Sequence, residues 1–138
     1  MKFRIFSKQQ NLYTNSPLWP SNQRSFSNWA VYPSGEVVEL VFFSAKNESV
    51  LEVHDSRNFI VEPYTGYSDS KGKKIYRGDL LQLDCFGLIY EIDWKLDRFV
   101  MKPKFEASGE IPDHFRDHKD TSTAWSVVGN IHGVEYED

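Results

Sequence analysis

The 138-residue chain has only one cysteine, Cys85, so it cannot form an internal disulfide bond. Small secreted domains usually depend on disulfides, and a reducing compartment is therefore expected. The first residues are too charged, and their apolar run is too short, for a secretory signal peptide. No apolar stretch approaches the length of a membrane span. Together these absences predict a cytoplasmic protein that makes no membrane contact.

Alanine, the strongest helix former, occurs only four times. Aromatic residues, in contrast, make up 15% of the chain, and their flat side chains favour strands over helices. We therefore expect a mainly β fold: a small bent sheet or partly open barrel with an added N-terminal β layer and long loops. An α+β fold with one or two short helices is the alternative. The length is that of a single domain, 1–138, within which residues 1–62 would form the N-terminal layer and residues 63–138 the barrel-like core.

Alternation of apolar and polar residues predicts where the strands lie. The expected strands are 2–7, 29–32, 37–43, 59–61, 80–85, 88–94, 98–102 and 125–131. Residues 50–53 fit a strand, and a short helix over residues 48–53 is the competing interpretation. Two long polar loops are expected, one at 11–27 with Trp19 docked on the body and one at 106–123 with room for a helical turn at 113–118. The expected core consists of Phe3, Ile5, Val38, Leu40, Phe42, Ile75, Leu81, Leu83, Tyr90, Ile92, Trp94, Val127 and Ile131.

The charge of the chain is distributed unevenly. Residues 1–104 contain 14 Lys and Arg against 12 Asp and Glu, whereas residues 105–138 contain 2 against 8. The formal net charge of −4 provides no global positive field that would draw the chain onto nucleic acid or acidic lipid. The acidic end of the chain, residues 135–138, is expected to fray.

A dense motif lies between Tyr64 and Leu80. It reads Tyr64-Thr65-Gly66, Asp69, Lys71-Gly72-Lys73, Ile75-Tyr76 and Gly78-Asp79-Leu80. In order and spacing this run resembles the YopX family of phage and prophage proteins. The resemblance extends to Lys2-Phe3-Arg4, to Gly35-Glu36-Val37 and to the run from Trp125 to Ile131. One departure is Arg77, which stands where the family usually has Glu and so weakens the idea of a catalytic carboxylate at that position.

What the resemblance implies is limited. It suggests a phage-linked origin in a bacterial host cell, a β-rich fold and self-association as a homo-oligomer. It supplies no established activity. We therefore expect a non-enzymatic binding or assembly module that needs no cofactor.

The motif has a structural interpretation. Glycines supply backbone conformations that side chains forbid, and tyrosines pack their rings in a core with the hydroxyl near water or a backbone acceptor. The carboxylate that follows the last glycine would accept backbone N–H bonds at the entry to the next strand. The residues with these expected structural roles are Tyr64, Gly66, Gly72, Tyr76, Gly78 and Asp79.

The motif also has a functional interpretation. Four basic side chains alternate with aromatic ones over a short stretch, which is the combination that holds a phosphate backbone and stacks bases. The candidate binding residues are Tyr67, Lys71, Lys73, Lys74 and Arg77. The alternative function is thus a small-barrel nucleic-acid-binding protein.

The signals for catalysis are weaker. His114 and His118 are four residues apart and would share one face of a helix, so they are candidate metal ligands for a metal-assisted hydrolase. Cys85 lies in an apolar strand and is expected to be an inert buried thiol. Glu91 and Asp93 alternate with apolar residues and are expected to face water. The remaining histidines, at positions 54 and 132, are isolated in the sequence.

Overall fold

The structure is a computed structural model that describes residues 2–20, 26–43, 46–83, 89–95, 98–104 and 125–137. These parts of the chain are built from strands, with a single short 3-10 helix, η1 (Ser56–Asn58). The prediction of a mainly β fold is therefore confirmed, and the described residues contain no α-helix that would support the α+β alternative. No helix in the described parts is long and apolar enough to span a membrane.

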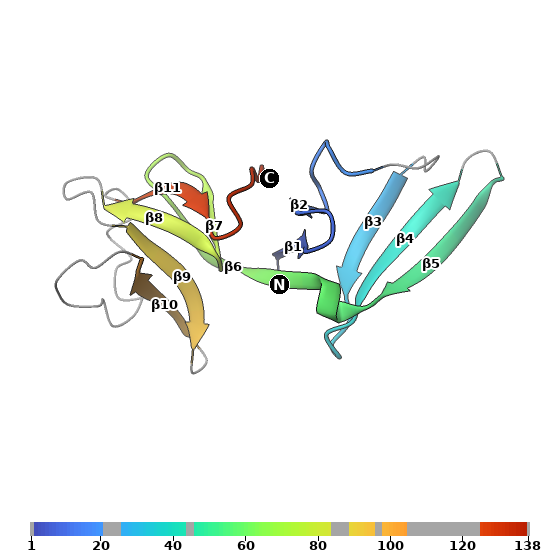
Figure 1. The fold of residues 1–138 in the computed structure, drawn as a ribbon, viewed down its shortest axis with the longest axis horizontal. Helices are drawn as coiled ribbons and strands as arrows, with labels where there is room; N and C mark the ends of the chain where they lie inside the picture. Colours follow the sequence, from blue (N-terminus) through green and yellow to red (C-terminus); the bar gives the residue numbers. More distant parts are fainter. Residues whose placement is uncertain are drawn as a thin grey trace. The chain divides into compact units, whose positions relative to one another are not determined.

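The chain forms two compact units. Residues Ile5–Val61 make up what we call the N-terminal unit, and residues Met1–Arg4 together with Glu62–Asp138 make up the C-terminal unit. Figure 1 shows the strands of both units. They are β1 (Phe3–Ser7), β2 (Leu12–Tyr13), β3 (Phe26–Val31), β4 (Val37–Phe43), β5 (Glu48–His54), β6 (Phe59–Ser68), β7 (Lys74–Tyr76), β8 (Asp79–Leu83), β9 (Ile89–Lys95), β10 (Arg98–Pro103) and β11 (Trp125–Asn130).

A four-stranded sheet has the order β2-β1-β6-β7. The boundary between the units falls inside two of its strands, after Arg4 in β1 and after Val61 in β6. The β6 strand is longer than the expected 59–61, because it continues through the first residues of the motif as far as Ser68. Apolar alternation stops at Val61, which is why the expected strand ends there.

The N-terminal unit contains an antiparallel sheet in the order β3-β4-β5. The ambiguous segment at 50–53 is a strand, within β5. In β4, Val37, Glu39 and Val41 face the interior, whereas Leu40 is 42% exposed. The expectation that Leu40 lies in the core is therefore wrong. Leu40 belongs to a strongly apolar run, but the fold buries the Glu39 carboxylate beside His54, which puts Leu40 on the outer face.

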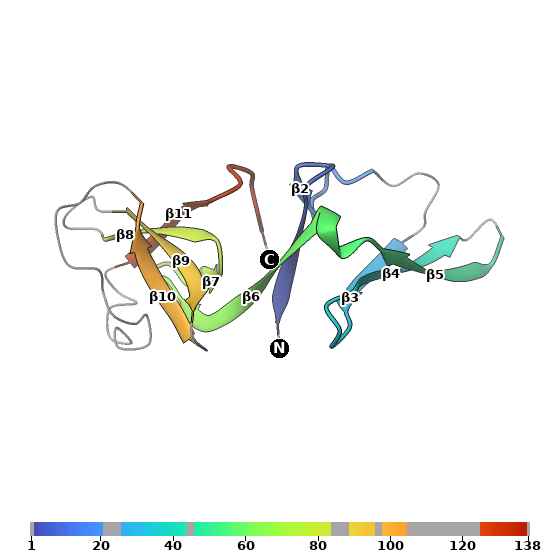
Figure 2. The same ribbon diagram turned by 60° about the horizontal axis from the view of Figure 1, so that its bottom comes forward.

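The C-terminal unit contains a curled sheet in the order β10-β9-β8-β11, visible in Figures 1 and 2. The β9–β10 hairpin is paired from Arg98 opposite Lys95 to Pro103 opposite Tyr90, as its alternation predicted. Lys102 of β10 contacts Asp93 at 3.1 Å and Glu91 at 3.6 Å, so these carboxylates are partly buried and paired rather than simply solvated. Burial alone would raise the pKa of Asp93, but the Trp94 amide, Lys102 and Arg77 together lower it.

The sheet of the C-terminal unit encloses a hydrophobic core. The core is formed by Ile75, Leu81, Tyr90, Ile92, Met101 and Trp125, with Tyr67, Phe99 and Val127 packed against it. The expectation of burial is confirmed for Ile75, Leu81, Tyr90 and Ile92, and in the N-terminal unit for Ile5 and Val38.

Several residues of the expected core lie elsewhere. Trp94 and Ile131 are each 42% exposed, so these two expectations are wrong. Both follow the apolar alternation but lie at or beyond a strand end, where the sheet no longer covers them; the Trp94 ring instead packs edge-on against Phe99 at 4.6 Å. Phe3 and Phe42 are only partly buried, and the side chain of Leu83 lies outside the described residues.

Candidate functional site

A buried ion cluster lies in the C-terminal unit. The Arg4 Nε donates to Glu62 Oε1 at 2.7 Å, and Arg4 Nη1 lies 2.8 Å from Asp79 Oδ1. All three side chains are at most 2% exposed. Taking charges out of water is costly unless they pair and form hydrogen bonds, so this arrangement requires all three partners at once. Arg4 comes from β1, Glu62 from β6 and Asp79 from the start of β8.

Aromatic rings and a carbonyl complete the surroundings of the Arg4 guanidinium. Its central carbon lies 4.9 Å from the centre of the Tyr76 ring and 5.0 Å from that of Tyr136, distances at which a cation is attracted to a ring face. The two tyrosine rings contact each other edge-on at 5.3 Å. Arg4 Nη2 also donates to the carbonyl of Arg77 at 3.2 Å. The guanidinium is therefore fixed in position and orientation.

The end of the motif builds this cluster. Gly78 has a φ of 88°, and a Cβ at this position would collide with the carboxylate of Glu62. Asp79 Oδ2 accepts the backbone N–H of Tyr76 at 2.8 Å, the kind of bond that the sequence suggested for this residue. Gly66 and Gly72 also have positive φ values, 90° and 82°. The Tyr64 and Tyr76 rings pack against each other at 5.5 Å, with Tyr76 fully buried.

The electrostatic environment of Asp79 is unusual. Burial raises the pKa of its carboxyl to about 6, although Arg4 and the Tyr76 amide pull the pKa down. The nearby Glu62 charge adds to the rise. Perturbed acids of this kind are concentrated at functional sites, although buried structural clusters produce them as well.

A histidine and an asparagine join the cluster from the end of the chain. His132 Nε2 lies 2.9 Å from Glu62 Oε2, so the impression from sequence that this histidine is isolated is wrong. Asn130 Nδ2 donates to the carbonyl of Val134 at 2.6 Å, and its Oδ1 accepts the N–H of His132 at 3.0 Å. Asn130 therefore holds the turn that carries His132. No local pattern predicted this, because Glu62 and His132 are 70 positions apart.

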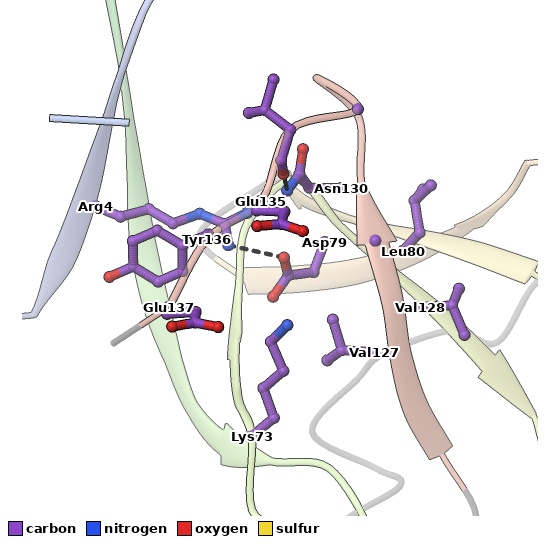
Figure 3. Close-up of a pocket in the computed structure, with 13 residues that line it drawn as sticks. Arg4, Lys73, Asp79, Leu80, Val127, Val128, Asn130, Glu135, Tyr136 and Glu137 are labelled. Atoms are coloured by element: carbon purple, nitrogen blue, oxygen red, sulfur yellow. Dashed lines mark hydrogen bonds and ion pairs between the residues drawn. The ribbon is translucent and has the colours of Figure 1, made fainter. Parts of the chain in front are cut away.

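A pocket of about 560 Å³ opens beside the cluster (Figure 3). Arg4 and Asp79 line it together with Lys73, and Figure 3 shows the Lys73 ammonium pointing toward the Asp79 side. The other lining residues are Leu80, Val127, Val128, Gly129, Asn130, Gly133, Val134, Glu135, Tyr136 and Glu137. The expectation that residues 135–137 fray is wrong, because Tyr136 docks on Arg4 and Tyr76 and this part of the tail becomes a pocket wall.

Asp69 positions the turn that carries Lys73. Its carboxylate is buried and accepts backbone N–H bonds from Lys71 at 2.9 Å, from Lys73 at 2.8 Å and from Val127 at 3.0 Å. These bonds tie the turn before β7 to β11. Sequence reasoning placed Asp69 in a turn but missed this link, because Val127 lies 58 positions away.

The structure does not gather the five candidate binding residues at this pocket. Lys73 lines it, whereas the Tyr67 ring packs against the core of the curled sheet. Arg77 Nε bonds Asp93 of β9 at 3.2 Å. Lys71 is exposed in the turn, and Lys74 is partly buried on β7. The other candidates, His114, His118 and Cys85, lie outside the described residues, as does the expected turn at 113–118.

Comparison with known proteins places the chain in a family. The family described as YopX protein matches residues 2–134. No curated protein matches the chain. Among solved structures, the crystal structure of protein EF1440 from Enterococcus faecalis superposes with a TM-score of 0.55, covering 96% of this chain and 93% of that one. The two sequences are 16% identical, so this likeness concerns the fold alone. Because the family match spans nearly the whole chain, the protein belongs to the YopX family.

Proposed function

We propose that this chain is a phage-type accessory protein that acts by binding a basic segment of another protein, with the pocket beside Arg4 and Asp79 as the contact site. Membership of the YopX family supports the phage-type role. The chemistry of the pocket supports the choice of partner, as follows.

The observation that carries the proposal is the balance of exposed charge around the pocket. The Arg4 charge is already engaged by Glu62 and Asp79, which are as buried as Arg4 itself. Among the exposed residues that line the pocket, Lys73 carries an ammonium group, and Glu135 and Glu137 carry carboxylates. This excess of negative charge favours a ligand with a lysine or arginine side chain over a phosphate. The acidic composition of residues 105–138 would add long-range attraction for such a partner.

The pocket is better suited to binding than to catalysis. Asp79 is the pocket residue with a raised pKa, but one of its oxygens contacts Arg4 and the other accepts the Tyr76 amide. A general base must reach a proton on a substrate, but the Asp79 side chain that carries these engaged oxygens is only 2% exposed. We therefore assign Asp79 a structural role in shaping the pocket.

The test compares three probes at low salt: a lysine-rich 12-residue peptide, a glutamate-rich peptide of equal length and a single-stranded oligonucleotide. We expect the basic peptide to bind and the double variant Glu135→Gln with Glu137→Gln to bind it roughly five- to tenfold more weakly, since each exposed charge pair contributes up to about 1 kcal/mol. Glu36→Gln, an exposed glutamate in the N-terminal unit, is the matched control and should bind like the wild type.

Two outcomes would contradict the proposal. Equal binding of both peptides, or none, would remove the pocket as a site for basic segments. Preferential binding of the oligonucleotide, lost on Lys73→Glu with Lys74→Glu, would instead favour the nucleic-acid alternative, which stays a prediction.

We also propose that the chain self-associates. The support is an apolar patch on the outer face of the sheet of the N-terminal unit, where Leu40, Leu51 and Val53 are 42%, 53% and 58% exposed. Leu40 and Leu51 are direct cross-strand partners, so the patch is continuous across β4 and β5. Clustered apolar side chains of this kind often mark interaction surfaces.

A further inference from the structure

A second pocket, of about 180 Å³, lies within the N-terminal unit. Glu39 and His54 line it, and aromatic rings from Trp19, Trp29 and Phe59 form much of its wall. His54 stacks on Trp29 with ring centres 4.9 Å apart, and the Phe59 ring meets it edge-on at 5.4 Å. The imidazole is therefore held in a fixed orientation at the edge of a small cavity.

Three side chains with metal-binding atoms converge at this point. His54 Nε2 lies 3.1 Å from Glu39 Oε1 and 3.8 Å from Glu52 Oε2. One ligand atom from each residue falls within 4.8 Å of the other two. The strand register explains this, because Glu39 is directly opposite Glu52 and Val37 is opposite His54. Alternation along β4 and β5 then puts all three ligand residues on the same face of the sheet.

These separations suit a metal ion. Zinc binds nitrogen and oxygen ligands at about 2.0–2.2 Å, so two ligands in a tetrahedral site lie roughly 3.4 Å apart. The two measured separations fall on either side of that value. Three protein ligands beside a cavity would leave the fourth position open to water or a small ligand, which is the arrangement of a non-structural zinc site.

We propose that Glu39, Glu52 and His54 bind one divalent transition-metal ion, with Zn²⁺ preferred. The imidazole selects this class of metal over Mg²⁺ and Ca²⁺, which favour oxygen ligands alone. The two carboxylates would balance the charge of the ion. The Glu39 carboxylate is fully buried, and an ion would provide it with a strong compensating charge in the interior.

The site is distinct from the candidates that the sequence suggested. His114 and His118 are candidate metal ligands because their spacing of four residues is visible in the sequence. Glu39, Glu52 and His54 are spread over two strands, and the ligand geometry depends on the β4–β5 register. The proposal does not rest on the proposed function, because the pocket for basic segments belongs to the C-terminal unit.

The test is a metal titration of the full chain after treatment with a chelator and removal of the chelator. We expect native mass spectrometry and calorimetry to show one Zn²⁺ per chain, and Co²⁺ to give the visible absorption of a site with nitrogen and oxygen ligands. Mg²⁺ and Ca²⁺ should not compete. Zn²⁺ should also raise the melting temperature, because it binds the folded chain.

Three variants sharpen the test. Glu52→Gln should weaken Zn²⁺ binding at least tenfold, and His54→Gln should abolish it. Glu48 lies on the same strand and is exposed, so the Glu48→Gln variant should bind Zn²⁺ as tightly as the wild type. If His54→Gln does not fold, Glu52→Gln decides the outcome, because its side chain is 35% exposed and its loss perturbs the interior less.

The proposal is overturned if the wild type binds no Zn²⁺, or if Glu52→Gln binds as tightly as Glu48→Gln. It is also overturned if His114→Gln with His118→Gln removes binding while His54→Gln retains it. In the absence of metal binding, Glu39 and His54 would form only a partly buried side-chain hydrogen bond.

Discussion

At the scale of single residues, Gly78 and Asp79 determine whether the ion cluster of the C-terminal unit can form. Gly78 lies against the carboxylate of Glu62 with a positive φ, so two separate costs follow from adding even one methyl group. One is backbone strain, and the other is displacement of a buried charge from its partner Arg4. The sequence predicts the backbone strain at Gly78, but the closeness of the Glu62 carboxylate is visible only in the structure.

We predict that Gly78→Ala lowers the free energy of unfolding by about 2–4 kcal/mol, measured by urea denaturation. Gly35→Ala is the control, because Gly35 has a similar φ of 92° but open space where a Cβ would lie. It should lose only about 1 kcal/mol, which represents the strain alone. Equal losses in the two variants would show that the approach of Glu62 to Gly78 has no energetic weight.

Asp79 makes stability depend on pH in a definite direction. Its pKa is about 6 in the folded chain and 3.8 when unperturbed, so between these values the folded state binds more protons than the unfolded state. The contribution of Asp79 is therefore fully favourable below about pH 4 and is lost as the pH rises through 6. We predict that the free energy of unfolding of the wild type, relative to Asp79→Asn, falls by up to about 3 kcal/mol between pH 4 and pH 7. A constant difference over that range would contradict a raised pKa.

At the scale of elements, the phase of β4 decides which of its side chains support the N-terminal unit. Val41 is fully buried, whereas its neighbour Leu40 is 42% exposed. We predict that Val41→Ala lowers the free energy of unfolding by about 2–3 kcal/mol, while Leu40→Ala costs less than about 1 kcal/mol. Thermal denaturation of both variants measures the difference. If Leu40→Ala were more destabilising than Val41→Ala, Leu40 would face the interior, as expected from the sequence.

The positions of the strands could be predicted from the sequence, but the face of each strand that is buried could not always be predicted. Alternation located β4, β9, β10 and β11 within one or two residues, because each has a regular apolar face. It failed at Leu40, because a pattern cannot show that the neighbouring Glu39 is buried beside a histidine on the next strand. It also failed where an apolar residue lies at a strand end, as Trp94 does, because nothing local reveals where the sheet stops covering it.

The same limit explains the candidate sites. The motif marked Lys73, Gly78 and Asp79, all of which take part in the pocket or the ion cluster. Their partners Arg4 and Tyr136 come from opposite ends of the chain, and no pattern of neighbouring residues connects them. A single sequence shows local spacing well and long-range pairing poorly. The contacts of Arg4 and Tyr136 could therefore be identified only from the structure.

At the scale of the whole molecule, the apolar patch of the N-terminal unit bears on self-association. Leu51 is 53% exposed in the middle of β5, so placing a charge there should leave the fold intact. We predict that light scattering at high concentration shows an oligomer for the wild type and a smaller species for Leu51→Lys, with Lys46→Glu as an exposed control outside the patch. A wild type that remains monomeric would contradict the proposal that the chain self-associates.

The discontinuous make-up of the C-terminal unit has a consequence for the order in which the chain acquires its structure. The N-terminal unit is one uninterrupted stretch, Ile5–Val61, so all of it is synthesised before Glu62. Arg4 emerges earlier still, yet its partner Glu62 is synthesised 58 residues later, and Tyr136 follows later again. Closing so long a loop costs entropy before any contact compensates for it. The guanidinium must therefore stay hydrated until Glu62 and Tyr136 have been synthesised, and its burial is a late event in the folding of the C-terminal unit.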